Sequence, residues 1–314
     1  MALPDVAVVV ATRDRPDRLG RCLDALAEQE RRPDEVVVVD DGSRPPVDSR
    51  PGALDRPGLR VRVLRRSSPS GPAAARNQGW RAASAPWIAF TDDDCRPAPG
   101  WISALLDGAD PDGVRVGRTL PDPADGPRTS ITDRTVRVER FDGGFHACNV
   151  AYPRALLERL GGFDEGFRRP FGEDTDLGQR ALRAGAGAAF VPAAVVRHAV
   201  HRDGVIGLLR ERRRLGDQAR LARLHPELRR GLFAGPFAYG EHRALLASVA
   251  GLALLPVTPA GLAPLGRYAE MCRSRVLDLP PRRRALDLAG TVAIDLYEVA
   301  VCAAGSARHR SLLL

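Results

Sequence analysis

Two valine-rich runs constrain the fold of this chain more than any other feature. Residues Val6–Val10 and Val36–Val39 are uninterrupted, β-branched and apolar. This pattern is typical of a strand that is covered on both faces, because in a half-exposed strand apolar residues would alternate with polar ones. Between the runs, Pro16 suits the first turn of a helix, and apolar residues then recur at helical spacing: Leu19, Cys22, Leu23 and Leu26. Two buried strands joined by a helix predict a parallel sheet.

The alternation of predicted strands and helices continues along the chain to residue 92 and then weakens. We expect a half-exposed strand around 59–63, a helix over 73–83 and a buried strand over 87–90. The predicted fold class is therefore α/β: a mostly parallel sheet flanked by helices, followed by a C-terminal helical extension. Further expectations are a mobile surface loop, two short strands and a helix that Gly185 closes, at 121–133, 145–151, 188–191 and 171–183.

The character of the chain changes near residue 204, so we predict one domain over 1–204 and a helical region over 205–314. An arginine-rich amphipathic helix is expected over 205–228, and residues 244–265 then contain no charged residue. Prolines inside that run argue against one straight helix. It is either a hairpin that dips into a membrane or a buried helix followed by a proline-rich turn. The preceding basic helix suits anionic headgroups, which favours membrane contact over a solvated face packed on the domain.

Composition excludes several other classes. A formal charge of +8 and a pI near 10 are typical of proteins that bind nucleic acids. All 47 basic residues are arginine, however, and G+C-rich codon usage raises the arginine content without any binding function. Nine arginines against four acids lie between Arg202 and Arg230, so the excess is local and we predict no specific nucleic-acid partner. The five cysteines form no C-x-x-C pair and the N-terminus resembles no signal peptide, which predicts reduced thiols in the cytoplasm.

An acidic cluster, Asp92-Asp93-Asp94, directly follows the predicted strand over 87–90. Three aspartates in a row are often a solvated turn, but open α/β sheets bind ligands beyond the carboxyl ends of their strands. Adjacent carboxylates repel one another, and a hard divalent cation is the usual means of holding them together. Such a cation can bridge a diphosphate. The cluster therefore predicts a metal-assisted diphosphate site.

Two further acidic groups are candidates. Asp40-Asp41 also ends a buried strand, where a carboxylate can accept a base N–H or a ribose hydroxyl, or can simply form an Asp-Gly turn. At the start of a predicted helix, Glu173, Asp174 and Asp176 exceed what one helix cap needs, and either Glu173 or Asp174 could act as a general base. No G-x-G-x-x-G follows the first strand and the chain has no lysine for a P-loop, which disfavours dinucleotide and P-loop enzymes.

Eight ordered segments give the chain a family resemblance. They are VAVVVATRDRP, EVVVVDDGS, GPAAARNQGW, IAFTDDDCRPAPGW, HACNVAYPR, GGFDEGF, FGEDTDLGQRALRAG and VVRHAVHR. Over about residues 5–205 the sequence resembles a family 2 glycosyltransferase with the GT-A nucleotide-sugar fold. The resemblance implies an inverting enzyme that uses a nucleoside-diphosphate sugar and a divalent metal, Mn²⁺ or Mg²⁺. The residues 205–314 look like those of membrane-associated bacterial members.

For the donor, the resemblance implies roles for one turn and five single residues. The turn Ala11-Thr12-Arg13 lies beside the nucleotide base, Asp41 accepts the base N–H, and Arg76 reaches the nucleotide or its diphosphate. Asp92 and Asp94 form the D-x-D element, with Asp92 or Asp93 facing the ribose. Arg13 replaces the aromatic residue usual in the first loop, and Asp41 can pair with uracil, thymine or guanine, so the base stays open.

For the metal and the chemistry, the resemblance implies Asp94 and Asp92 as acidic ligands and His198 as a further ligand, with His201 as the alternative. Asp174 is implied as the catalytic base, beside Glu173. No Q-x-x-R-W element follows, so addition of a single sugar is expected rather than polymerisation. The acceptor is expected to be a glycan, a lipid-linked glycan or a small molecule. The resemblance also implies a cytoplasmic enzyme that is associated with the inner face of the cell membrane and contributes to a cell-envelope polysaccharide.

Two other functions compete with transfer. A non-catalytic nucleotide-sugar scaffold or sensor would need the same donor site, and the presence of both Asp174 and Asp94 argues against it. A nucleotidyltransferase also has metal-binding aspartates, but it normally carries a glycine-rich loop with a basic residue after its first strand. The segment ATRDRP is a poor match to such a loop.

Overall fold

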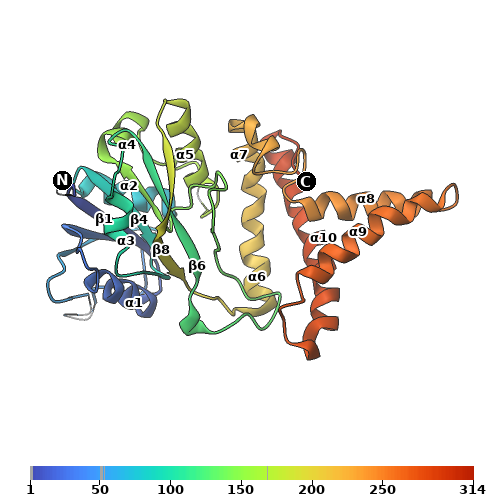
Figure 1. Cartoon of the computed structure of the whole chain (residues 1–314), viewed down its shortest axis with the longest axis horizontal. Coiled ribbons are helices and arrows are strands. Elements are labelled where there is room, and N and C mark those ends of the chain that lie inside the picture. The colour runs from blue at the N-terminus through green and yellow to red at the C-terminus, as the bar shows by residue number, and fades with distance from the viewer. Residues whose placement is uncertain (1–2, 50–51, 53, 168) are drawn as a thin grey trace. The chain divides into compact units, whose positions relative to one another are not determined.

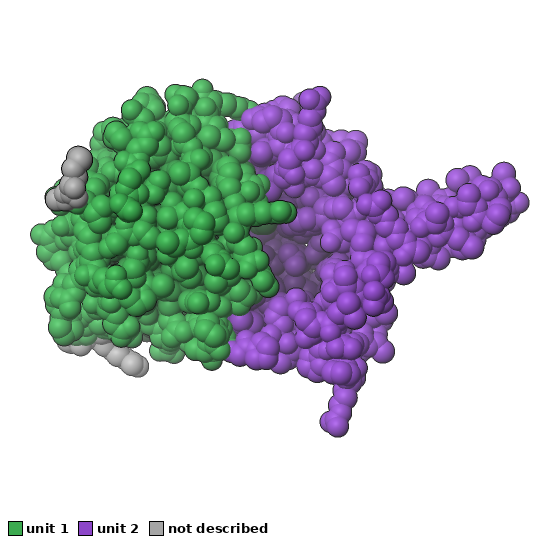
Figure 2. Space-filling view, viewed as in Figure 1, with its two compact units in different colours: residues 1–125, 135–199 green, residues 126–134, 200–314 purple. Residues whose placement is uncertain are grey.

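The computed structural model, which describes residues 3–49, 52, 54–167 and 169–314, divides into two compact units (Figure 2). Unit 1 comprises residues 1–125 and 135–199, and unit 2 comprises residues 126–134 and 200–314. The segment 126–134, inside the loop expected over 121–133, is thus part of the second unit. Here Ser130 Oγ donates a hydrogen bond to Asp287 Oδ1 at 3.0 Å.

Unit 1 is built on a mixed sheet of eight strands in the order β3-β2-β1-β4-β7-β6-β8-β5. The first four, which carry the valine-rich runs, are parallel, as predicted. Beyond β4 the pairs β4–β7, β6–β7 and β5–β8 are antiparallel, whereas β6–β8 is parallel. The α/β fold class is therefore confirmed, with a parallel half and a mixed half. The strands are Val6–Thr12 (β1), Glu35–Asp40 (β2), Val61–Arg65 (β3), Trp87–Asp92 (β4), Cys95–Pro97 (β5), Val114–Pro121 (β6), Val150–Pro153 (β7) and Ala188–His198 (β8).

Helices cover both faces of the sheet (Figure 1). Val8 and Val38 point into the core that α1 and α3 cover, whereas Val9 and Val37 point into the core of α2, α4 and α5. The alternation of a strand thus places successive valines in two separate cores, which explains why these runs contain no polar residue. The helices are Pro16–Ala27 (α1), Pro72–Ala82 (α2), Trp101–Leu106 (α3), Arg154–Leu160 (α4) and Glu173–Arg183 (α5), and a short 3₁₀ helix, η1, spans Pro123–Asp125.

The strand expected over 145–151 is shorter than predicted. It begins only at Val150, because Phe145 has a φ of 51° and turns the backbone out of the extended conformation. The Phe145 ring is buried against Gly178 of α5, where a methyl group would lie 2.0 Å from the ring. A turn pinned by this ring, rather than a strand, therefore leads into β7.

Unit 2 is helical. The helix expected over 205–228 is broken into α6, η2, α7 and η3, and the uncharged run 244–265 is divided between α8 and α9, with Pro256 in the turn. The two helices pack side by side as a hairpin (Figure 1). The elements are Gly204–Arg212 (α6), Arg213–Asp217 (η2), Gln218–Leu224 (α7), Pro226–Arg230 (η3), Gly240–Leu254 (α8), Pro259–Gly261 (η4), Leu262–Ser274 (α9), Pro281–Arg283 (η5) and Arg284–His309 (α10).

In the part of the chain that the structure describes, one helical stretch is long and apolar enough to cross a membrane. It covers Pro281–His309, with a mean hydropathy of 1.5 over its most apolar window. This is not the run 244–265 that the sequence singles out. Asp287, Asp295 and Glu298 interrupt the apolar residues of α10, and they hide the pattern from a search for uncharged segments.

A substitution at Gly79 tests how closely α2 packs on the sheet. A methyl group at this position would lie 2.4 Å from Val9 Cγ1 and 3.1 Å from Val39 Cγ2. We expect Gly79→Ala to lower the free energy of unfolding by about 1 to 3 kcal/mol, the usual cost of overpacking. Urea unfolding measures this. Gly20→Ala in α1 is the matched control, since its nearest neighbour would be Arg56 Nη2 at 3.6 Å, and it should be neutral or stabilising. Equal losses for the two variants would contradict this packing.

Candidate active site

The acidic cluster lies where β4 ends beside β1. Thr12 Oγ1 donates a hydrogen bond to Asp93 Oδ2 at 2.8 Å. Arg15 Nη1 lies 3.2 Å from Asp93 Oδ1 and 3.1 Å from Asp94 Oδ2, and Arg18 Nη1 lies 3.6 Å from the same Asp94 oxygen. Two arginines at the start of α1 therefore balance part of the cluster's charge. Neither arginine was predicted from the sequence, although their spacing of three residues at the start of the helix after β1 was a usable signal.

The three aspartates have different surroundings. Asp93 is buried, and burial together with the Asp94 carboxylate raises the pKa of Asp93 to about 6. The Asp92 side chain is 30% exposed and accepts a hydrogen bond from Arg76. Of the two residues predicted to face a ribose, Asp92 is therefore the one that solvent reaches.

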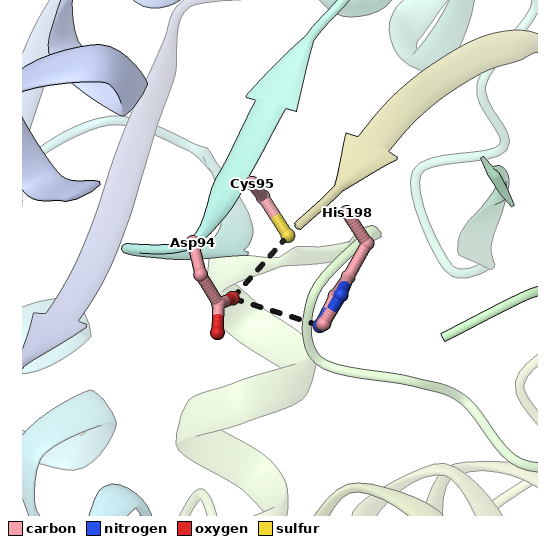
Figure 3. A group of neighbouring side chains, drawn as sticks. All are labelled: Asp94, Cys95 and His198. Atoms are coloured by element: carbon pink, nitrogen blue, oxygen red, sulfur yellow. Dashed lines mark hydrogen bonds and ion pairs between the residues drawn. The ribbon is translucent and has the colours of Figure 1, made fainter. Parts of the chain in front are cut away.

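Asp94, Cys95 and His198 form a compact group of possible metal ligands (Figure 3). Cys95 opens β5 and pairs in register with His198 at the end of β8, so sheet pairing brings both residues beside Asp94. His198 Nε2 lies 3.6 Å and Cys95 Sγ 3.9 Å from Asp94 Oδ1, and the three ligand atoms lie within 4.8 Å of one another. A carboxylate, an imidazole and a thiol are ligand types that transition metals accept. The residues present therefore fit a divalent metal.

His198 is oriented by its second ring nitrogen. Nδ1 lies 2.9 Å from the Ala199 carbonyl oxygen and 3.3 Å from Thr135 Oγ1, which leaves Nε2 directed at Asp94. Burial lowers the pKa of the imidazole, but the Asp94 carboxylate and neighbouring groups outweigh it, and the net shift is upward. His201, the alternative ligand, belongs to unit 2, and its backbone pairs with that of Arg134. Cys95 was not predicted, although it directly follows the acidic cluster.

Arg76 joins the acidic cluster to the start of α5. Its Nη2 lies 2.7 Å from Asp92 Oδ1 and its Nη1 lies 2.7 Å from Glu173 Oε1. The side chain is only 6% exposed, and its guanidinium carbon lies 5.8 Å from the centre of the Phe163 ring. A cation buried to this extent requires carboxylate partners. Arg76 therefore fixes two residues that are 81 positions apart in the chain.

Of the two possible bases, only Asp174 is accessible. Glu173 is buried, and burial together with Asp174 raises the pKa of the Glu173 carboxyl to about 7, against the opposing effect of Arg76. The Asp174 carboxylate is half-buried and accepts hydrogen bonds from the backbone N–H groups of Ala147 at 3.1 Å and Thr175 at 2.7 Å. Asp176 instead pairs with Arg180 at 2.8 Å, one turn along α5.

The residues predicted to bind the nucleotide base lie at the carboxyl ends of β1 and β2. Asp41 is buried, and its carboxylate accepts hydrogen bonds from the backbone N–H groups of Ser70 and Gly71, both at 2.9 Å. Ala11 and Thr12 end β1, and Arg13 is exposed beside Asp14 at 3.4 Å. The structure thus ties Asp41 to the turn before α2. A contact between Asp41 and a base stays a prediction.

Besides Arg15, Arg18 and Cys95, three further residues in or beside the site were not predicted from the sequence. Asn77, the neighbour of Arg76, accepts hydrogen bonds from Phe163 N and Trp80 Nε1, both at 2.9 Å, and so holds the segment GGFDEGF in place. Asn149 accepts a hydrogen bond from Trp101 Nε1 at 2.8 Å. His146 Nε2 lies 2.9 Å from Asp142 Oδ2. Although burial lowers its pKa, Asp142 and Asp174 raise it to about 9. The segments ARN and HACN were recognised as motifs, but only the structure assigns partners to these side chains.

Comparison with known sequences identifies the family. The sequence model described as glycosyl transferase family 2 matches residues 7–157. The N-acetylglucosaminyl-diphospho-decaprenol L-rhamnosyltransferase of Mycobacterium tuberculosis is 30% identical over 246 residues, which cover 64% of this chain and 79% of the relative. The pre-mycofactocin glycosyltransferase of the same species is 33% identical over 210 residues, which cover 62% of this chain. The chain spans only 42% of that second relative. It belongs to the family 2 glycosyltransferases.

A solved structure shares the fold. The mannosyltransferase PcManGT from Pyrobaculum calidifontis, in complex with GDP-Man and Mn²⁺, aligns with a TM-score of 0.67 and 23% sequence identity. The alignment covers 97% of this chain and 88% of that protein. The predicted GT-A-type fold is thereby confirmed.

The Arg76 bridge predicts a large effect on stability. Arg76→Met leaves Glu173 buried without its partner, and we expect the free energy of unfolding to fall by about 3 to 5 kcal/mol. Urea unfolding at neutral pH measures this. Arg81→Met, on the same helix, removes an exposed arginine 3.7 Å from Glu165 and should cost less than about 1 kcal/mol. If adding Glu173→Leu to Arg76→Met recovered no stability, the cost would not arise from the unpaired carboxylate.

Proposed function

We propose that this chain transfers one sugar from a nucleoside-diphosphate sugar to a hydroxyl group of an acceptor, with inversion at the anomeric carbon. The observation that carries the proposal is the Arg76 bridge. It joins the acidic end of β4, beside the possible metal ligands, to the start of α5, where Asp174 is accessible. A diphosphate site and a general base held by one buried guanidinium are the two parts that a single displacement requires.

Asp94 and His198 are the residues proposed to hold a divalent metal, Mn²⁺ or Mg²⁺, with the Cys95 thiol beside them and Asp92 as the other acid of the D-x-D element. When bound, the metal would supply positive charge opposite the donor diphosphate. The relation to PcManGT supports a metal, since that protein holds Mn²⁺ together with GDP-Man.

Asp174 is the proposed general base. Its hydrogen bonds to the Ala147 and Thr175 N–H groups orient the carboxylate, which takes the proton of the acceptor hydroxyl as that oxygen attacks the anomeric carbon. Attack opposite to the departing diphosphate inverts the carbon in one step. Glu173 is the proposed positioning residue, because it is buried and holds Arg76. Arg76 in turn would offset the charge that develops on the leaving group.

The nucleotide and acceptor are proposed by class. Ala11, Thr12, Arg13 and Asp41 are the proposed surroundings of the base. The acceptor is proposed to be a lipid-linked or cell-envelope glycan at the inner face of the membrane, in line with a relative whose name specifies a decaprenol-linked substrate. A non-catalytic nucleotide-sugar sensor is the second candidate, and it would bind the donor without transfer.

Asp174→Asn separates the two candidates. The amide keeps the shape of the side chain but cannot take a proton, so the transfer rate should fall by about 10²- to 10⁴-fold while donor binding is retained. Sugar transfer from a panel of nucleotide sugars measures the rate, and calorimetry measures donor binding. Glu158→Gln, an exposed acid on α4, is the control and should leave both unchanged. Transfer near the wild-type rate in Asp174→Asn would refute this base.

A thermal-shift experiment tests the metal and the nucleotide. A ligand that binds only the native state raises its melting temperature. We expect UDP, GDP, dTDP or CDP to stabilise the protein with Mn²⁺ or Mg²⁺ and not with EDTA. Asp94→Ala and His198→Ala should abolish the metal-dependent part, whereas Asp112→Ala, an exposed acid of unit 1, should retain it. An undiminished shift in Asp94→Ala would exclude the proposed metal ligands.

A further inference from the structure

The long helix of unit 2 has its apolar residues outside and its charges inside. Every exposed residue of α10 between positions 285 and 304 is alanine, valine or leucine. Among the large apolar residues of this set, the most exposed are Leu286, at 69%, and Leu296, at 51%. A helix on the surface of a water-soluble domain has the opposite arrangement, with its polar face outward. The exposed face of α10 is therefore suited to an apolar environment.

The charged groups on the buried face of α10 are paired within unit 2. Asp295 lies 2.7 Å from Arg275 Nη1 and accepts a hydrogen bond from Tyr268 at 2.8 Å. Glu298 lies 2.8 Å from Arg212 Nε and 3.1 Å from His242 Nε2. Because these carboxylates already have partners elsewhere in unit 2, on α6, α8, α9 and the turn after α9, the helix cannot cross a bilayer alone, with lipid on all sides. Only its outer face is available to lipid.

The hairpin of α8 and α9 has an uncharged, exposed tip. No charged residue lies between Arg243 and Arg267, and Val257 is 83% and Leu254 53% exposed. The hairpin extends away from α10 and its far end stands clear of the other helices of unit 2 (Figures 1 and 2). An apolar projection of this kind in water needs a partner.

Close backbone contact holds the two arms of this hairpin together. A methyl group at Gly251 would lie 2.3 Å from the Gly261 carbonyl oxygen, and one at Gly261 would lie 2.2 Å from that of Gly251. A methyl group at Gly305 of α10 would likewise lie 2.2 Å from the Gly216 carbonyl oxygen. Small residues that let helix backbones touch are frequent where helices pack within lipid. The tip is thus held by packing that does not depend on burying its large apolar side chains.

Charge identifies the partner. Unit 2 has 20 arginines and 11 acidic residues, a formal charge of +9, whereas unit 1 has 27 arginines and 28 acidic residues, a charge of −1. A second copy of the chain would bring two strongly positive units together, which electrostatic repulsion opposes. An anionic bilayer offers both an apolar interior and negative headgroups.

We propose that unit 2 docks on an anionic bilayer from one side, with the tip of the α8–α9 hairpin inserted among the lipids and the exposed face of α10 against them. This surface is neither the arginine-rich segment 205–228 alone nor a membrane-crossing helix. The proposal goes beyond sugar transfer and uses none of the residues assigned to it.

Flotation of the full chain with vesicles tests the proposal. We expect binding to phosphatidylcholine vesicles that contain phosphatidylglycerol, weaker binding to phosphatidylcholine alone, and a loss at high salt. The double variant Leu254→Glu/Val257→Glu should bind at least about tenfold more weakly, because two inserted apolar side chains become charged. Leu182→Glu on α5, also an exposed apolar residue, is the matched control in unit 1 and should bind like the wild type. Equal binding of the double variant and the wild type would overturn the proposal.

A second measurement reports insertion directly. The three natural tryptophans, Trp80, Trp87 and Trp101, are all buried in unit 1. In V257W, the added indole should shift its emission to the blue with anionic vesicles and be quenched by lipids brominated on their acyl chains. Emission that stays unshifted and unquenched would refute insertion.

Two further outcomes separate membrane docking from dimerisation and from sugar transfer. Without lipid, a dimer that the double variant dissociates, together with no vesicle binding by the wild type, would assign the tip to a second copy and overturn the proposal. The double variant should keep the metal-dependent nucleotide stabilisation of the wild type. Loss of vesicle binding with that stabilisation intact supports the proposal whether or not sugar transfer is ever detected, so the two hypotheses fail separately.

Discussion

The candidate active site depends on the burial of one arginine between two carboxylates. Arg76 comes from α2, whereas Asp92 ends β4 and Glu173 opens α5. An arginine cannot lose its proton in a protein, so its charge must be met by carboxylates once the fold excludes water. The two resulting ion pairs fix the end of β4 relative to the start of α5. The position of Asp174 beside Ala147 follows from this constraint, because Asp174 is the next residue after Glu173.

The sheet supplies the framework that brings these residues together. Because β1, β2 and β4 are parallel, their carboxyl ends lie at one edge, and Thr12, Asp41 and the acidic cluster follow from those ends. Strand β7 runs antiparallel to β4 and β6 runs antiparallel to β7, so β6 and its parallel neighbour β8 run in the same direction as β4. The carboxyl end of β8, with His198, therefore lies at the same edge. The short strand β5 pairs antiparallel with β8 there, so that Cys95 and His198 lie beside Asp94 from one register position.

The sequence predicted what depends on neighbouring residues and missed what depends on distant ones. Periodicity located β1, β2, α1 and α2, and the position of the aspartates after a buried strand located the site. The sequence could not show whether Glu173 or Asp174 is the accessible general base, because that depends on Arg76, nearly a hundred residues away. Strand β6 was missed because its arginines, Arg115 and Arg118, interrupt the apolar pattern. The apolar face of α10 was missed because the partners of its acids are visible only in three dimensions.

The two units differ in where they place charge, and this difference bears on how such an enzyme meets its substrates. In unit 1 several buried charges, among them Arg76, Asp93 and Glu173, gather at the site, where a charged donor would bind, and the unit as a whole is nearly neutral. In unit 2 the buried acids Asp295 and Glu298 of α10 pair with residues of other helices and of the turn after α9, so that apolar residues lie on the outer face of α10 in a unit with an excess of arginine. A donor nucleotide sugar is soluble, whereas a lipid-linked acceptor stays in the bilayer. The proposed docking would confine the enzyme to the surface where the proposed lipid-linked acceptor lies, and that acceptor would then need only weak contacts.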